Sequence, residues 1–143
     1  MPGLAALKLL VIDDNKQMRT IIGSVLGGAG VRQVYYAPDG WTGVVTATDV
    51  RPDVVFVDYE MPTMNGLEFI SVIRSRDSFN RYLPIIMLTG HADMPRLAQA
   101  RDRGVTEFLA KPVTAKDILR RLDAVLMHPR PFIQRPDYFG LEY

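Results

Sequence analysis

Five side chains that could do chemistry each come at the end of an apolar stretch. They are Asp13 and Asp14 after KLLVI, Asp58 in VVFVD, Thr89 in IIMLT, and Lys111 after EFLA. Three carboxylates that lie close together repel one another, so at neutral pH they need a bound cation or a raised pKa. All-oxygen ligands suit a hard ion, and Mg²⁺ in particular where phosphate takes part. The three aspartates are therefore a candidate magnesium site.

The hydroxyl and the ammonium group in this set suit a phosphoryl group. Lys111 offers a compact positive charge to a phosphoryl oxygen, and Thr89 offers one hydroxyl donor. A carboxylate can act as the nucleophile and form an aspartyl phosphate. A single acidic residue at a strand end is a solvated cap about as often as it is a functional residue. Finding such polar side chains at four strand ends of the same chain is therefore the stronger indication of function. The set fits in-line phosphoryl transfer to a carboxylate.

The elements that must position these side chains alternate in apolar period. Continuous apolar runs predict buried strands, and i, i+3, i+4 stripes predict helices. We expect strands at 8–13, 31–37, 53–58, 83–90 and 106–111, and helices at about 18–26, 39–48, 65–75, 94–103 and 114–127. Five βα units in series predict a parallel sheet with helices on both faces. In such a sheet the site lies at the carboxyl ends of the strands.

Local signals set the ends and the inward faces of several helices. Asn65 is a candidate N-cap, Thr114 with Asp117 resembles a capping box, and Gly104 is a candidate C′ residue. The weak helix at 39–48 is expected to pack through Trp41 and Val45. The helix that ends near Arg103 has few large apolar residues, which indicates a weakly packed, movable element.

Composition excludes several functions. The chain has 143 residues, a net charge of +1, two histidines and no cysteine, which leaves no strong field for nucleic acid or an acidic membrane and no thiolate chemistry. No apolar run reaches the length of a membrane span, and the first residues do not have the pattern of a signal peptide. We expect a cytoplasmic protein that binds neither nucleic acid nor membrane.

Four motifs resemble the receiver domain of two-component response regulators. They are LLVIDDN (Leu9–Asn15), VVFVDYEMPTMNG (Val54–Gly66), PIIMLTG (Pro84–Gly90) and FLAKP (Phe108–Pro112), in an order and spacing that agree from residue 7 to about 127. The resemblance implies a flavodoxin-like (βα)5 doubly wound α/β fold of strand order 2-1-3-4-5. It implies a receiver domain at 1–127 and a Pro- and aromatic-rich tail at 128–143 with no separate output domain.

The resemblance also implies a role for each residue of the set. Asp58 is the phosphoacceptor. Asp13, Asp14 and Asp58, with the backbone carbonyl of Glu60, hold Mg²⁺. Thr89 and Lys111 bind the phosphoryl group and switch.

Three further features follow from the same resemblance. Phe108 stands at the aromatic switch position, either as a ring that rotates inward or as static core. Glu60 and His91 stand where side chains tune hydrolysis of the aspartyl phosphate, or they are solvated loop residues. The Lys111–Pro112 bond is expected to be cis.

The implied function is a stand-alone bacterial response regulator of the chemotaxis type. It accepts a phosphoryl group from a sensor histidine kinase or a phosphotransfer protein. It then switches the face made by the helix at 94–103, the strand at 106–111 and the helix at 114–127. It is not an enzyme beyond phosphotransfer to Asp58 and slow hydrolysis. The alternative is a pseudo-receiver, a dimerisation or interaction module whose output does not depend on phosphorylation.

Three other classes fit less well. An aspartate-based phosphatase would carry a second acid–base aspartate two residues after Asp58, where Glu60 stands. A nucleotide-binding module would have a Gly-rich loop after LLVIDD. A DNA-binding regulator would need a helix-turn-helix after residue 127, where the chain is neither basic nor helical.

The tail, His128–Tyr143, combines prolines with large apolar side chains. Pro129, Pro131 and Pro136 exclude a continued helix, while the aromatic content is higher than a disordered end usually has. A floppy end is the alternative. We expect extended or turn-like chain that docks on its own domain, on a partner or on a second copy. A homodimer near helices four and five or helix one is the favoured outcome.

Overall fold

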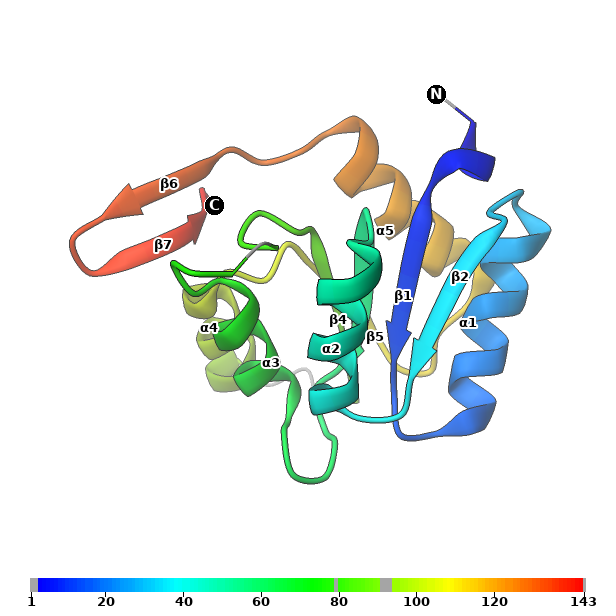
Figure 1. The fold of residues 1–143 in the computed structure, drawn as a ribbon, viewed down its shortest axis with the longest axis horizontal. Helices are drawn as coiled ribbons and strands as arrows, with labels where there is room; N and C mark the ends of the chain where they lie inside the picture. Colours follow the sequence, from blue (N-terminus) through cyan, green and yellow to red (C-terminus); the bar gives the residue numbers. More distant parts are fainter. Residues whose placement is uncertain (1–2, 79, 91–93, 143) are drawn as a thin grey trace.

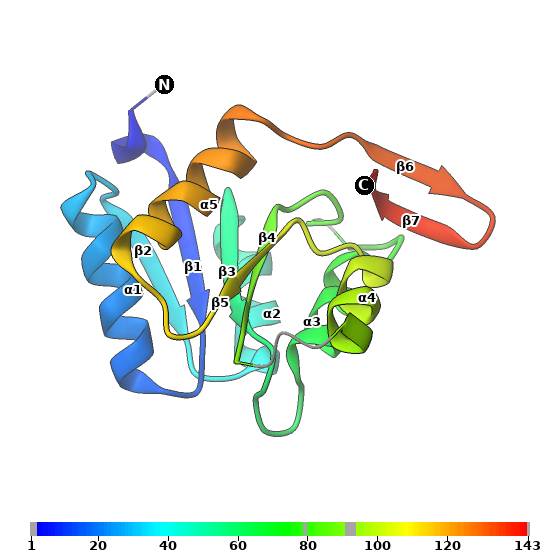
Figure 2. The same ribbon diagram turned by 180° about the vertical axis from the view of Figure 1, so that it is seen from behind.

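The computed structural model describes residues 3–78, 80–90 and 94–142 and contains one parallel sheet of five strands. The strands are β1 (Lys8–Ile12), β2 (Gln33–Ala37), β3 (Val54–Asp58), β4 (Ile85–Thr89) and β5 (Glu107–Ala110). Their order is β2-β1-β3-β4-β5; the sheet is drawn in Figure 1, and Figure 2 labels all of its strands. The expected fold class is confirmed.

Helices cover both faces of the sheet (Figures 1 and 2). They are α1 (Lys16–Gly28), α2 (Gly40–Val50), α3 (Gly66–Ile73), α4 (Met94–Arg103) and α5 (Ala115–Met127), preceded by a short 3₁₀ turn at Leu4–Ala6. One core cluster joins the sheet to α2, α3 and α4, and the other joins it to α1 and α5. β3 and β4 are buried along their whole length, which explains their continuous apolar sequences.

The strand register brings the carboxyl ends together. Asp58 at the end of β3 pairs with Leu88, Thr89 at the end of β4 pairs with Ala110, and β1 runs beside β3 with Ile12 opposite Val57. The side chains that follow these strand ends therefore share one edge of the sheet, which we call the rim.

Side-chain caps begin the helices as the sequence suggests. Asn65 accepts a hydrogen bond from the backbone N–H of Glu68, and the Glu68 carboxylate accepts one from the N–H of Asn65 in return, a complete capping box. Thr114 accepts a hydrogen bond from the N–H of Asp117, which is one of the two bonds of the expected capping box. Gly104 follows α4 with a φ of +101°, a left-handed conformation that favours glycine.

The expectation that α2 packs through Trp41 and Val45 is wrong. Both side chains are 59% exposed. The inward face of α2 instead consists of Gly40, Gly43 and Ala47. A Cβ on Gly43 would lie 2.4 Å from Cδ1 of Ile12, so the helix lies too close to the sheet for a large residue on that side. Trp41 and Val45 are consequently left on the outer face.

The tail forms a β-hairpin against its own domain (Figure 1). β6 (Phe132–Arg135) and β7 (Tyr138–Leu141) pair antiparallel through a two-residue turn at Pro136 and Asp137. β7 packs on α4, and Leu141 is buried. The tail was expected to dock on its own domain, on a partner or on a second copy, and in this single chain it docks on its own domain. A hairpin was not predicted.

The hairpin packs on α4 and on the loop before β4, a region that we call the hairpin edge. Tyr82, in the loop before β4, makes edge-on ring contacts with Phe132 and Phe139 at centroid distances of 5.1 and 5.6 Å. Arg130 pairs with Glu107 of β5 at 3.0 Å. The tail thus connects α5 to the amino-terminal ends of β4 and β5.

No helix in the described parts of the chain has both the length and the apolar character needed to cross a membrane.

Candidate functional site

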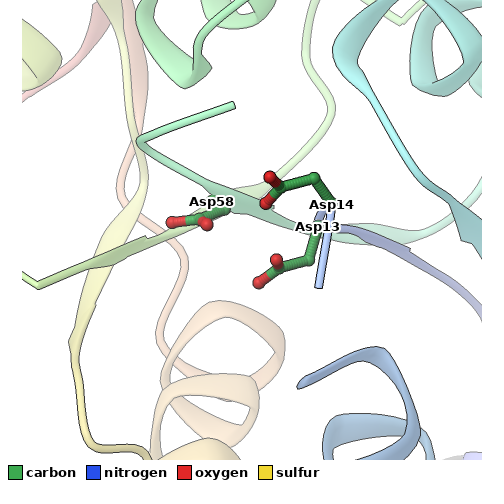
Figure 3. A group of neighbouring side chains, drawn as sticks. All are labelled: Asp13, Asp14 and Asp58. Carbon is green, nitrogen blue, oxygen red and sulfur yellow. The ribbon is translucent and has the colours of Figure 1, made fainter. Parts of the chain in front are cut away.

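The three aspartates meet at the rim. Asp13 and Asp14 follow β1, and Asp58 ends the adjacent strand β3 (Figure 3). One carboxylate oxygen from each residue lies within 4.8 Å of the others. Asp13 is fully buried and Asp58 is 4% exposed, whereas Asp14 is open to solvent. The rim therefore holds two carboxylates that have lost most of their water and one that can meet a ligand from outside.

Burial raises the pKa of both inner carboxyl groups. Desolvation is the largest cause of the rise in the pKa of Asp13 to about 6, the hydrogen bond from the N–H of Asn15 opposes it, and the negative charge of Asp58 adds to it. Desolvation also raises the pKa of Asp58, against the hydrogen bond and charge of Lys111. A cation in this space would favour the ionised form of every carboxylate.

The donor set fits magnesium. Within the described residues, Oδ2 of Asp13 is buried without a hydrogen-bond partner, while Oδ1 accepts the N–H of Asn15 at 2.9 Å. A buried, unpaired carboxylate oxygen is costly unless a cation or a proton meets it. Among the residues that the structure describes, the group that could hold a metal ion consists of three carboxylates, and such an oxygen site suits a hard divalent ion.

Lys111 and Thr89 lie beside this cluster. The ammonium nitrogen of Lys111 donates to Oδ2 of Asp58 at 3.0 Å. The backbone N–H of Lys111 donates to the carbonyl of Thr89 at 2.9 Å, which joins the ends of β4 and β5. Thr89 is buried. The Lys111–Pro112 peptide bond is cis, as expected.

The loop after β3 bends back on the strand end. The N–H of Gly66 donates to the carbonyl of Tyr59 at 2.8 Å. A Cβ on Gly66 would lie 2.7 Å from the carbonyl oxygen of Asp58, which real Cβ atoms do not tolerate. Glycine at this position lets α3 begin directly against the residue that carries the central carboxylate.

The remaining candidate residues are less uniform. Phe108 in β5 is half-buried and lines an apolar groove with Met94 and Leu97 of α4. Glu60 stands at the rim, and its carboxylate accepts from Nη1 of Arg96 at 2.7 Å. His91 lies outside the described residues. The contact of Arg96 was not predicted, because nothing in a helical arginine's sequence context indicates which loop it will reach.

Comparison with known proteins agrees with this geometry. Residues 9–123 match the response regulator receiver domain family. The chain is 35% identical over 123 residues to chemotaxis protein CheY1 of Helicobacter pylori, covering 84% of this chain and 97% of that protein. It is 30% identical over 119 residues to chemotaxis protein CheY-3 of Vibrio cholerae, covering 83% of this chain and 91% of that one.

Solved structures show the same fold. Chemotaxis protein CheY4 of Vibrio cholerae superposes with a TM-score of 0.78 at 31% identity, over 83% of this chain and 98% of that one. The receiver domain of the sensor histidine kinase PA1611 of Pseudomonas aeruginosa gives 0.73 at 29% identity, over 82% and 94%, and it carries a magnesium ion in its active-site cleft. The chain belongs to the response regulator receiver domain family of two-component signalling.

Proposed function

We propose that this protein is a stand-alone, cytoplasmic response regulator that accepts a phosphoryl group on Asp58 from a sensor histidine kinase or a phosphotransfer protein. One observation carries the proposal above the others. A buried strand presents the Asp58 carboxylate between two further carboxylates on one side and the Lys111 ammonium, 3.0 Å away, on the other. The carboxylates form a place for a divalent cation. The ammonium group supplies a fixed positive charge for a phosphoryl oxygen.

The proposed reaction is an in-line displacement at phosphorus. An Asp58 carboxylate oxygen attacks the phosphoryl group of a phosphohistidine, the new O–P bond forms, and the P–N bond breaks with the electron pair returning to the imidazole. Lys111 then moves its hydrogen bond from the carboxylate to a phosphoryl oxygen. Asp13, Asp14, Asp58 and the backbone carbonyl of Glu60 would hold Mg²⁺, which when bound neutralises the charge gathered at the rim.

The proposed output is a change in the face made by α4, β5 and α5. Thr89 would follow the phosphoryl group through its hydroxyl, and Phe108 would respond from the neighbouring strand. The apolar groove lined by Met94, Leu97 and Phe108 lies on this face. Within α4, Ala100 is the one buried residue, so a shift of this helix breaks few core contacts.

Intact mass tests the phosphoacceptor. The protein is incubated with phosphoramidate, a small phosphodonor, in two separate reactions. One reaction contains Mg²⁺, and the other contains a chelator in its place. We expect one added phosphoryl group with Mg²⁺ and none with chelator or in Asp58→Asn. An unchanged mass of the wild-type protein in every condition would leave the pseudo-receiver alternative.

Lys111→Ala tests the switch. The variant should fold and keep much of its metal affinity, because the ammonium group is not a ligand. Loss of a charged contact to the phosphoryl group costs about 1.5–3 kcal/mol, so phosphorylation should no longer change the α4 resonances in NMR spectra. Wild-type spectral changes in the variant would remove Lys111 from the switch.

A homodimer involving the tail remains a proposal of its own. The observation that favours it is the position of β6 at the outside of the hairpin. Gln134 and Arg135 of β6 are exposed, and β7 pairs with only one edge of this strand. Deletion of residues 130–143 should lower the mass in solution from dimer to monomer. Two monomeric proteins at high concentration, phosphorylated or not, would contradict it.

A further inference from the structure

Arg96 connects α4 to the loop that begins at the phosphoacceptor. It lies in the first turn of α4, and its Nη1 donates to Oε1 of Glu60 at 2.7 Å. Its guanidinium carbon stands 4.8 Å from the ring centroid of Tyr59. One side chain therefore contacts both residues that immediately follow Asp58.

The contacted loop is held at its backbone and open at its side chains. The N–H of Tyr59 donates to the carbonyl of Leu88 at 2.9 Å, and the backbone of Glu60 lies near enough to the Asp58 carboxylate to lower its pKa. The Glu60 side chain, in contrast, is 60% exposed. The backbone of Glu60 is thus fixed close to Asp58, while its carboxylate is restrained by the ion pair with Arg96.

A hollow at the rim joins these groups to Asp14, the exposed member of the acidic cluster. Asp14, Tyr59, Glu60, Asn65 and Arg96 are among the residues that line it. A carboxylate released into this hollow could reach water that approaches Asp58 from outside. Arg96, by holding Oε1 of Glu60, keeps that carboxylate at the wall of the hollow.

We propose that Arg96 is a positioning residue that prolongs the life of the phosphoryl group on Asp58 by keeping the Glu60 carboxylate away from the attacking water. The inference rests on the proposed phosphorylation of Asp58. In the hydrolysis step, water attacks phosphorus, its oxygen forms the new P–O bond, and the bond to the Asp58 oxygen breaks. Asp58 recovers its carboxylate, and the water proton leaves with phosphate or to solvent. A free Glu60 carboxylate orients this water by accepting its hydrogen bond; a Glu60 paired with Arg96 does not.

The experiment measures phosphate release from phosphorylated protein after the phosphodonor is removed. Arg96→Ala should shorten the half-life at least about threefold, a modest part of what a well-placed carboxylate contributes. The half-life of Glu60→Gln is measured as the reference for the double variant. The double variant should match Glu60→Gln, because the proposed effect of Arg96 on hydrolysis runs through Glu60. Arg96→Lys should restore part of the lifetime. Arg103→Ala is the matched control, since Arg103 lies on the same helix and contacts Ser71 at 3.2 Å instead.

Salt gives a second readout that a purely structural role of Arg96 would not move. The pair is partly exposed, with 35% of the Arg96 side chain accessible, so added salt weakens it. Wild-type hydrolysis should therefore accelerate with salt, while Arg96→Ala should not respond. An unchanged half-life in Arg96→Ala, or a shortening that persists beside Glu60→Gln, would overturn the proposal while leaving the phosphoacceptor intact. Absence of any phosphorylated protein would overturn the proposed function and this inference with it.

Discussion

Arg74 and Asp13 are both buried charged residues, but only one of them is fully paired. Arg74 lies under the tail hairpin, where Nε and Nη2 donate to the carbonyl of Gly104 and Nη1 donates to the carbonyls of Arg81 and Leu83. Asp13 lies at the rim, where one of its carboxylate oxygens has no hydrogen-bond partner among the described residues and its pKa is raised. The edge under the hairpin is built for stability, whereas the rim keeps an unfavourable charge that a ligand can relieve.

The largest expected effect is at the hairpin edge. Arg74→Ala should lower the free energy of unfolding by about 3–5 kcal/mol, because it leaves several carbonyl groups without their donor under the hairpin. Arg74→Lys should recover little of this loss, since one ammonium cannot reproduce the planar fork. Urea denaturation measures both. Wild-type stability of Arg74→Ala would show that the buried guanidinium is not structural.

Replacing Asp13 at the rim with a neutral residue should raise the free energy of unfolding. In the metal-free protein the folded pKa of Asp13 is about 6, above its ordinary value of 3.8. The contribution of Asp13 to stability is therefore highest below about pH 4 and is lost as the pH rises from there through about 6. At pH 7 Asp13→Asn should raise the free energy of unfolding by up to about 3 kcal/mol, with no gain near pH 4.

Unfolding in chelator across this pH range tests the sign. Mg²⁺ should stabilise the wild-type protein and narrow its difference from Asp13→Asn, because the ion binds the folded state. A gain that is the same at pH 4 and pH 7 would mean that the charge of Asp13 is not its cause.

The contrast between strand ends and helix faces shows what the sequence could predict. The rim was predictable because each strand is a continuous apolar run, and the residue after it is fixed in space by the parallel register. The packing of α2 was not, because Gly43 and Ala47 let the helix approach Ile12 closely and turn the large residues outward. Trp41 and Val45 were expected to be buried because they are large and apolar, and that expectation was wrong.

The hairpin was missed for a different reason. Three prolines correctly excluded a helix, but the turn signal was already present in Pro136–Asp137 between Arg135 and Tyr138. Its docking depends on Arg74 and Tyr82, which are far from the tail in sequence. No local pattern reports such a contact, and the same holds for Arg96 and Glu60.

A smaller loss is expected when an aromatic contact of the hairpin is removed. Phe132 stacks on Phe139 at a centroid distance of 5.6 Å, and the Arg74 guanidinium lies 5.0 Å from its ring. Phe132→Ala should cost about 2 kcal/mol, less than a fully buried phenylalanine because the ring is half-exposed. Phosphorylation by a small phosphodonor should be unchanged. If phosphorylation fails in a folded Phe132→Ala, the two edges are not independent.

The smallest effect is expected on the outer face of α2. Trp41→Ala should change the free energy of unfolding by less than about 1 kcal/mol, because the side chain is 59% exposed. Leu26→Ala in α1 is the matched core control and should cost about 2–5 kcal/mol. Equal losses in the two variants would restore the first interpretation, in which Trp41 packs inward.

Chemical trapping tests the central claim most directly. Borohydride reduces an aspartyl phosphate to homoserine, and peptide mass spectrometry locates the converted residue. After incubation with phosphoramidate and Mg²⁺, we expect homoserine at position 58 alone, and none when chelator replaces the metal. Homoserine in place of Asp13 or Asp14, or no conversion in protein that binds Mg²⁺, would contradict the assignment of Asp58 as the phosphoacceptor.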